Sequence, residues 1–122
     1  MEKNITPLPL SYKQFVIIPK KPWMSPGKLI SQGCHATFMA LQGENKTLLE
    51  EWKKKGMCVI VLRCKNIEQL SNIAKYLEQW KIKHYLYIDE GVTEVEPMTP
   101  TALATGILTE DKYWMFKKFE LF

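Results

Sequence analysis

The sequence predicts an α/β fold, a single three-layer domain with a mixed four-stranded sheet and helices on both faces. Three observations lead to this prediction. The 122 residues are enough for one compact core and too few for two. Short apolar, β-branched runs alternate with segments of helical periodicity. Strands joined through helices should be parallel, whereas the last two strands, joined by a loop alone, should be antiparallel.

The expected elements follow the order β-α-α-β-α-β-β-α. The apolar run "FVII" (15–18) predicts a first buried strand. Ser25 is a good N-cap and Pro26 suits the first helical position, so a helix should run from there to about residue 42. A second helix is expected over 45–56, where Gly56 follows three lysines and ends it.

The second half of the chain supplies the other strands. "MCVIVLR" (57–63) is nearly continuous in apolar residues, which is typical of a strand buried on both faces. Asn66 and Gln69 have the spacing of a capping box, and the helix that they begin carries apolar residues at helical spacing as far as Trp80. The remaining elements are a third strand at 84–88, a fourth at 101–107, a short helix from Thr109 and a candidate edge strand in "FELF" (119–122).

The amino-acid composition indicates the kind of partner and the cellular compartment to expect. The net charge is +4, nearly all of it from lysine, which is compatible with a phosphate-bearing partner. Cys34, Cys58 and Cys64 are an odd number without a disulfide spacing, which favours a reducing compartment. The N-terminal residues lack the pattern of a signal peptide, and no apolar run is long enough to span a bilayer. We therefore expect a soluble cytoplasmic protein without a membrane partner.

The first expected helix carries an unusual polar stripe. At about 100° per residue, Lys28, Gln32 and His35 fall on one side, and the opposite side is apolar. Gly33 and Ala36 are small enough to let the helix approach the sheet closely. An ordinary solvated face remains the alternative, although such faces usually carry more Glu and Lys. Lys28 is expected to be an exposed helix residue.

The predicted strand order places the loop over 89–101 at a functional edge of the sheet. Asp89 ends the third strand, Thr101 begins the fourth, and Lys28 lies just beyond the first. Open α/β sheets bind ligands at the carboxyl edge of their parallel strands, so Lys28, Asp89, Thr93 and Thr101 should converge there. His35 should lie about 10 Å farther down the helix, on the wall of the site. Turn formation is the alternative role for the loop residues.

Other site chemistries fit the sequence poorly. It contains no HExxH, paired CxxC, P-loop or GxGxxG motif. Cys34 and His35 are adjacent on a helix and point about 100° apart, which is wrong for a nucleophile and its base. Two histidines and three scattered cysteines do not readily make a zinc site. We expect no metal and no cofactor.

Two motifs resemble those of the type-II peptidyl-tRNA hydrolases of archaea and eukaryotes. The family's first motif, Met-x-x-Gly-Lys followed by Gln and His-Ala, is matched by Met24, Gly27, Lys28, Gln32, His35 and Ala36. Its second motif, Asp-x-Gly-x-Thr followed by Pro, Thr and Gly, is matched by Asp89, Gly91, Thr93, Pro97, Thr101 and Gly106. The resemblance covers roughly residues 12–122, which leaves residues 1–11 as an N-terminal extension.

This resemblance implies the family's four-stranded mixed sheet, a homodimer, and hydrolysis of the ester that joins a peptide to tRNA, with water as nucleophile. Lys28 would face the developing oxyanion or a phosphate, and Asp89 would orient Lys28 or the water. Thr93 and Thr101 would supply hydroxyl groups, and His35 a proton or an RNA contact. The residues assigned to substrate binding are Lys20, Lys21, Gln32 and Gly91.

Some positions depart from the family pattern. Pro19, Lys20 and Lys21 replace its Arg-x-Asp, and Val92 replaces the Arg before the motif threonine. Glu90, Glu94 and Glu96 make the loop acidic, whereas "QGCHAT" and "KKFELF" resemble the divergent peptidyl-tRNA hydrolase domain-containing branch. The alternative function is therefore a catalytically inactive module on the same fold that binds RNA or a protein.

Overall fold

The computed structural model describes residues 11–91 and 94–122. The expected N-terminal extension, 1–11, lies outside the described residues except for Ser11. The elements are β1 (Tyr12–Pro19), α1 (Pro26–Ala40), α2 (Lys46–Lys54), β2 (Cys58–Cys64), α3 (Ile67–Gln79), β3 (His84–Asp89), β4 (Thr99–Thr109), the 3-10 helix η1 (Glu110–Phe116) and β5 (Glu120–Leu121).

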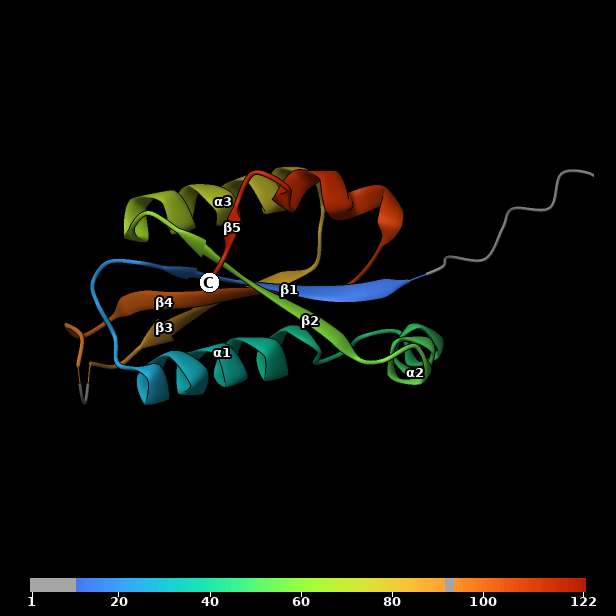
Figure 1. The fold of residues 1–122 in the computed structure, drawn as a ribbon, viewed down its shortest axis with the longest axis horizontal. Coiled ribbons are helices and arrows are strands. Elements are labelled where there is room, and N and C mark those ends of the chain that lie inside the picture. Colours follow the sequence, from blue (N-terminus) through green and yellow to red (C-terminus); the bar gives the residue numbers. More distant parts are fainter. Residues whose placement is uncertain (1–10, 92–93) are drawn as a thin grey trace, which may run out of the picture.

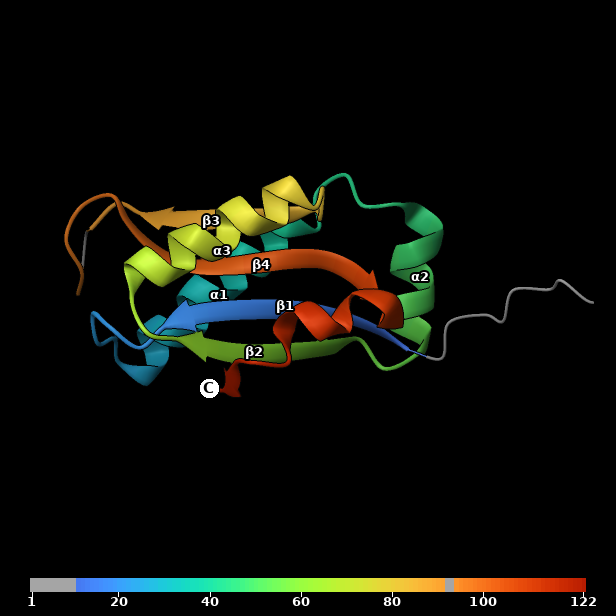
Figure 2. The same cartoon turned by 90° about the horizontal axis from the view of Figure 1, so that it is seen from above.

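The sheet has five strands in the order β3-β4-β1-β2-β5, so the expectation of four strands was wrong. The fifth strand is the short edge strand in "FELF", where Leu121 pairs with Leu62 and Glu120 with Arg63. β1 and β2 are parallel, as expected for strands joined through helices. β3 and β4, joined by a loop, are antiparallel, and β4 is antiparallel to β1. Figure 2 shows the central strands side by side from above.

Helices cover both faces of the sheet, as the sequence predicts. In Figure 1, α3 and η1 lie above the sheet, and α1 and α2 lie below it. The upper layer packs around Ile17, Leu70, Leu77 and Leu103, all almost fully buried. In the lower layer, the small residues Ala36 and Ala40 of α1 bring the helix close to the sheet. No helix of the described chain is long and apolar enough to cross a membrane.

The helix ends follow from side-chain caps. The Ser25 hydroxyl accepts a hydrogen bond from the Lys28 amide and Pro26 occupies the first turn, as expected for the start of α1. Asn66 caps α3 by accepting from the Gln69 amide at 2.9 Å. The Gln69 side chain reaches back to the Lys65 amide at 2.7 Å, one residue before the N-cap. This bond is a variant of the expected capping box.

Two expectations about burial were wrong. β2 is not buried on both faces, because Val59 and Val61 are 40% and 39% exposed on the α1 side of the sheet, where they border a groove that the helix does not fill. The expected apolar side of α1 is not the side that is most buried either, since Ile30 is 67% exposed and Cys34 is exposed as well. The helix instead buries the side that carries Gln32, Ala36 and Ala40, because small residues permit a closer approach to the sheet than Ile or Phe.

Candidate active site

Lys28 and Asp89 form a buried ion pair at the carboxyl edge of the sheet. The Nζ atom of Lys28, in the first turn of α1, donates to Oδ1 of Asp89, at the end of β3, over 3.1 Å. Their side chains are 11% and 10% exposed. The expected convergence of these residues is therefore present, but the expectation that Lys28 is exposed was wrong, because the lysine stem follows the helix surface toward the sheet.

Asp89 is held as a carboxylate by three donors. Burial by itself raises the pKa of this carboxyl group, but hydrogen bonds from the Gly91 amide, Lys28 and Gln32 and the charge of Lys28 hold the pKa below its ordinary value. The Gly91 amide donates to Oδ2 at 2.8 Å, so the two carboxylate oxygens have different partners. The resulting group is negatively charged at neutral pH and fixed in orientation.

Gly91 shapes the loop that follows β3. Its φ is +79°, a conformation that residues with a side chain rarely adopt. A Cβ atom here would lie 2.3 Å from the Cα of Pro97. The glycine therefore lets the chain turn tightly enough to direct its amide at Asp89. Its amide thus contacts Asp89 directly, and the assignment of Gly91 to substrate binding stays a prediction.

A β-bulge brings Thr101 into the same network. Ile88 pairs with Pro100 and Tyr87 with Ala102, so Thr101 is the additional residue on β4. Its hydroxyl donates to Oε1 of Gln32, while the neighbouring Ala102 also packs on the α1 side of the sheet. Regular alternation along a strand would have sent these two side chains to opposite faces. The network thus runs from Lys28 through Asp89 and Gln32 to Thr101.

His35 lies outside this network. Its ring is exposed and stacks on Tyr87 of β3, with centroids 4.8 Å apart and planes 21° apart. Its Nε2 lies 3.4 Å from the Ser31 hydroxyl, at the long end for a hydrogen bond. Sequence reasoning placed His35 on the wall of the site but missed Tyr87. Tyr87 precedes Asp89 by two residues on β3, a spacing that places both side chains on one face of a strand.

Glu94 ties the loop after β3 to the start of α1. Its carboxylate accepts from the Ser25 amide at 2.8 Å and from the Ser25 hydroxyl at 2.5 Å. These hydrogen bonds hold the pKa of Glu94 below its ordinary value. Ser25 also caps the helix that carries Lys28, so this contact joins the two segments that supply the ion pair. The sequence contained no signal for it beyond the acidic character of the loop.

Lys20 and Lys21 lie at the end of β1, on the same edge. The Lys20 amide donates to the Cys64 carbonyl at 2.9 Å, which brings this segment beside the end of β2 and the exposed Lys65. Among the described residues, these three lysines form no ion pair. They make an exposed basic group next to the network and are not part of it.

Thr93 lies outside the described residues, so its predicted place in the site is not tested. Within 11–91 and 94–122, no three His, Cys, Asp or Glu side chains gather where they could hold a metal ion. The site offers a buried ammonium group, a fixed carboxylate and a buried hydroxyl. Such groups can stabilise a developing negative charge and orient a water molecule without a cofactor.

The chain is similar in sequence to a known protein family. The model of the family described as "Peptidyl-tRNA hydrolase PTH2" matches residues 12–122. A peptidyl-tRNA hydrolase of Methanopyrus kandleri is 33% identical over 103 residues, which cover 83% of this chain and 89% of that protein. One of Aeropyrum pernix is 30% identical, with 78% and 82% covered.

A probable peptidyl-tRNA hydrolase 2 of Dictyostelium discoideum is 31% identical over 97 residues, which cover 77% of this chain and about half (46%) of that longer protein. The likeness to all three relatives thus extends over most of this chain, and the family model includes both segments that supply the Lys28–Asp89 pair. The chain belongs to the peptidyl-tRNA hydrolase PTH2 family.

Proposed function

We propose that this chain hydrolyses the ester bond between peptide and tRNA in peptidyl-tRNA, and so recycles tRNA in the cytoplasm. The observation that carries the proposal is the buried Lys28–Asp89 pair at the carboxyl edge of the sheet. Burying two charges is costly, and a pair of this kind adds little to stability compared with apolar residues. Membership of the family and the names of the relatives support the same activity.

In the proposed mechanism, water is the nucleophile and attacks the ester carbonyl. Lys28 stabilises the negative charge that develops on the carbonyl oxygen, and Asp89 orients Lys28 or the attacking water. Gln32 also forms a hydrogen bond to Asp89, and the Thr101 hydroxyl holds Gln32 in place. Thr93 supplies a second hydroxyl group, and His35, stacked on Tyr87, contacts RNA or transfers a proton at the rim.

The tRNA phosphates are proposed to bind at the basic group on the same edge. Lys20 and Lys21 are exposed there without ion-pair partners in the described chain. An ammonium group without a carboxylate partner is free to displace counterions from a phosphate backbone. Phosphates bound at these lysines would lie at the same edge of the sheet as the Lys28–Asp89 pair, where the ester is proposed to bind.

The decisive experiment replaces Asp89 by Asn and measures release of free tRNA from N-blocked aminoacyl-tRNA in single turnover. Asn keeps the shape and removes the charge, so hydrolysis should fall by about 10²–10³. Binding of tRNA should stay equal or become tighter, because a carboxylate that repels phosphates has been removed. Glu110→Gln, at the other end of β4, is the matched control and should hydrolyse normally.

Each outcome separates the candidate functions. A wild-type protein that binds tRNA and releases none would be the inactive binding module that the acidic loop allows. Near-normal hydrolysis by a folded Asp89→Asn variant would contradict the mechanism. Thermal melting of the same preparations identifies the third case, in which Asn unfolds the protein because Asp89 only shapes the turn.

We propose further that the chain forms a homodimer through the apolar surface between α1 and β2. A groove of about 700 Å³ lies there, and none of the described side chains that line it is charged. Its exposed apolar side chains are Ile30, Phe38, Met57, Val59, Val61 and Phe122. A surface of this kind does not attract phosphates, whereas the same surface on a second copy is complementary to it.

The oligomeric state tests this surface. Light scattering should give a dimer for the wild-type protein and a monomer for Val61→Lys, which places a charge in the middle of the groove. Tyr76→Lys on α3 changes an apolar residue of similar exposure on the opposite layer and should leave the dimer intact. A wild-type monomer at high concentration would contradict the proposal.

A further inference from the structure

Trp23 is the most exposed large apolar side chain of the described residues, at 72%. It lies in the short connection between β1 and α1, and Figures 1 and 2 both place this connection beside the loop after β3, at the same end of the sheet. A single exposed aromatic residue would not by itself indicate a site. The inference depends on how Trp23 is held and on what surrounds it.

The connection is fixed on both sides of Trp23. Before it, the Lys20 amide is bonded to the end of β2. After it, Met24 is only 3% exposed in the core cluster between α1 and the sheet, and Ser25 is bonded to Glu94 and caps the helix. The backbone on either side of the exposed indole is thus anchored. A ligand that stacks on the indole therefore binds with only a small entropic cost for ordering the protein.

The charged residues around Trp23 indicate which kind of ligand would bind there. Lys20, Lys21 and Lys65 provide three exposed ammonium groups on its side of the sheet edge. Aromatic side chains next to ammonium groups are the combination that binds single-stranded nucleic acid, since bases stack on the ring and phosphates meet the charges. A protein partner with an acidic surface would need the charges and would gain less from a flat aromatic ring.

The loop that joins β3 to β4 has the reverse charge. Glu90, Glu94 and Glu96 are exposed in it. Glu94 marks its boundary with the Trp23 connection, because its ionised carboxylate is bonded to Ser25 and is not free to meet a ligand from that side. Carboxylates repel phosphates, so a nucleic-acid strand approaching the ion pair is favoured on the Trp23 side and disfavoured on the loop side. The site therefore has a nucleotide side and a side left for the rest of the substrate.

We propose that Trp23 stacks on the unpaired base of the 3′-terminal nucleotide of peptidyl-tRNA, the nucleotide whose ribose carries the ester, while the neighbouring lysines contact the phosphates before it. This inference rests on the proposed function and adds a binding residue to it. A base bound at Trp23 would hold its ribose beside Lys28 and Asp89, and the peptide would extend toward the loop after β3.

The test is a double-mutant cycle in which binding alone is measured. The protein is wild type or Trp23→Ala, and the ligand is deacylated tRNA, either intact or with an abasic 3′-terminal nucleotide that keeps every phosphate. For the wild type, loss of the base should weaken binding about tenfold. For Trp23→Ala, intact tRNA should already bind about tenfold more weakly, and loss of the base should have no further effect, because both changes remove one contact.

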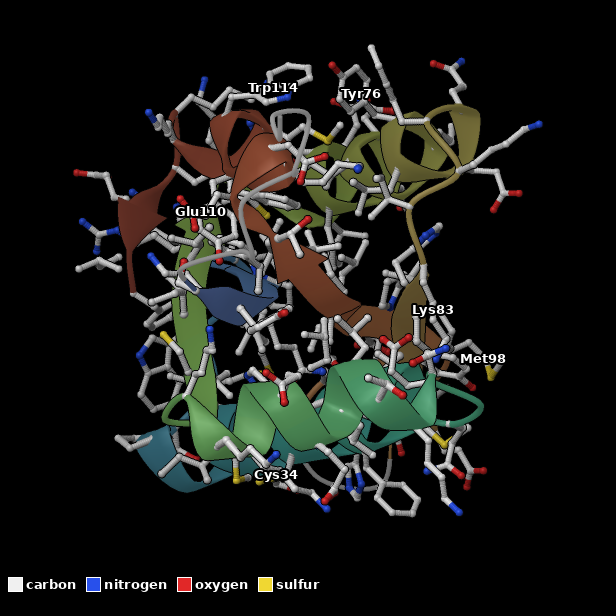
Figure 3. All side chains as sticks on the ribbon, turned by 90° about the vertical axis from the view of Figure 1, so that its right-hand side faces the viewer. Cys34, Tyr76, Lys83, Met98, Glu110 and Trp114 are labelled. Atoms are coloured by element: carbon white, nitrogen blue, oxygen red, sulfur yellow. The ribbon has the colours of Figure 1, made fainter. Side chains whose placement is uncertain are left out.

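Two further variants sharpen the result. Trp23→Phe keeps an aromatic ring and should retain most of the preference for the terminal base. Trp114→Ala removes an indole that is 50% exposed on the opposite layer and should bind both tRNAs as the wild type does. Figure 3 shows Trp114 and Tyr76 on that layer, on the other side of the sheet from Cys34 of α1.

The outcomes distinguish this inference from the function on which it rests. Additive losses in the cycle, or unchanged affinity of Trp23→Ala, would overturn the stacking contact even if the protein hydrolyses peptidyl-tRNA. Absence of tRNA binding and of hydrolysis in the wild type would overturn both. Hydrolysis together with non-additive losses would support both.

Discussion

Nζ of Lys28 and Oδ1 of Asp89 lie 3.1 Å apart, although the two residues are separated by 61 positions in the chain. The contact joins the first turn of α1 to the last residue of β3, two elements that meet only because the sheet places β3 beside β4 and α1 crosses beneath them. Because both side chains are about nine-tenths buried, removing either one leaves the other without its main partner.

Lys28→Met should abolish hydrolysis and also destabilise the protein. The change leaves Asp89 as a buried carboxylate with only its Gly91 and Gln32 donors, which should cost about 3 kcal/mol of unfolding free energy. The double variant Lys28→Met/Asp89→Asn removes both charges and should recover much of that stability while remaining inactive. Urea unfolding and single-turnover hydrolysis on the same preparations check both parts.

Lys54→Met is the matched control for Lys28→Met, because Lys54 forms its ion pair at the surface. Lys54 is 73% exposed and lies 3.5 Å from Glu51, a pair that contributes little. Its variant should unfold and hydrolyse as the wild type does. Full activity in folded Lys28→Met would remove Lys28 from the mechanism.

The contribution of Asp89 to the free energy of unfolding should decrease at acidic pH and stay constant at neutral pH. Its pKa in the folded protein lies below the ordinary value, which is about 3.9 for an unfolded chain. The contribution is therefore complete above the unfolded pKa and is lost as pH falls through the folded pKa. The difference in melting temperature between wild type and Asp89→Asn should stay constant from pH 7 to 5 and shrink near pH 3. A difference that already shrinks between pH 7 and 5 would show that the folded pKa is raised.

Thr101→Val should disturb the site through Gln32. Val has nearly the shape of Thr but no hydroxyl, so Oε1 of the buried Gln32 loses its donor. An unsatisfied buried acceptor costs about 1–3 kcal/mol. Thr101→Ser keeps the hydroxyl and should restore most of this stability and of the hydrolysis rate. If Val and Ser variants unfold at the same urea concentration, the hydroxyl does not matter to the network.

Binding of tRNA should weaken steeply with salt. The logarithm of the affinity should fall linearly with the logarithm of the salt concentration, with a slope of about −0.7 to −0.9 for each phosphate neutralised. Replacing Lys20 and Lys21 by Ala should reduce the magnitude of the slope by about 1.4 to 1.8, if each lysine neutralises one phosphate. The same change at Lys53 and Lys54, which lie on α2 at the far end of the sheet, should leave the slope unchanged. Affinity that does not respond to salt would favour a protein partner.

Much of the site could be predicted from local sequence. Lys28 and Gln32 are four residues apart on a helix, so they must share a face, and Asp89 ends a strand that the order of elements makes parallel to β1. The start of α1 was predictable because its cap, Ser25, and Pro26 act within one turn. These features depend on spacing and on chain order, which are read directly from the sequence.

The tertiary structure decided which faces are buried. Helical periodicity places Ile30 on the opposite side of the helix from Lys28 but does not say which side approaches the sheet. Close packing against the sheet favours the small residues Ala36 and Ala40, so Lys28 and Gln32 are carried inward with them and the larger apolar side chains remain outside. β2 remained open on that face because α1 lies beneath β4 and β3 and reaches only as far as β1.

The place of Thr101 also depended on the whole fold. Alternation along β4 assigns it to the face opposite Ala102, and only the bulge in the pairing with β3 brings its hydroxyl to Gln32. A bulge arises from the register of two strands and from the loop that joins them, here the turn around Gly91 and Pro97. The sequence by itself determined which polar groups reach this edge, whereas the registers and packing distances of the folded chain decided how those groups contact one another.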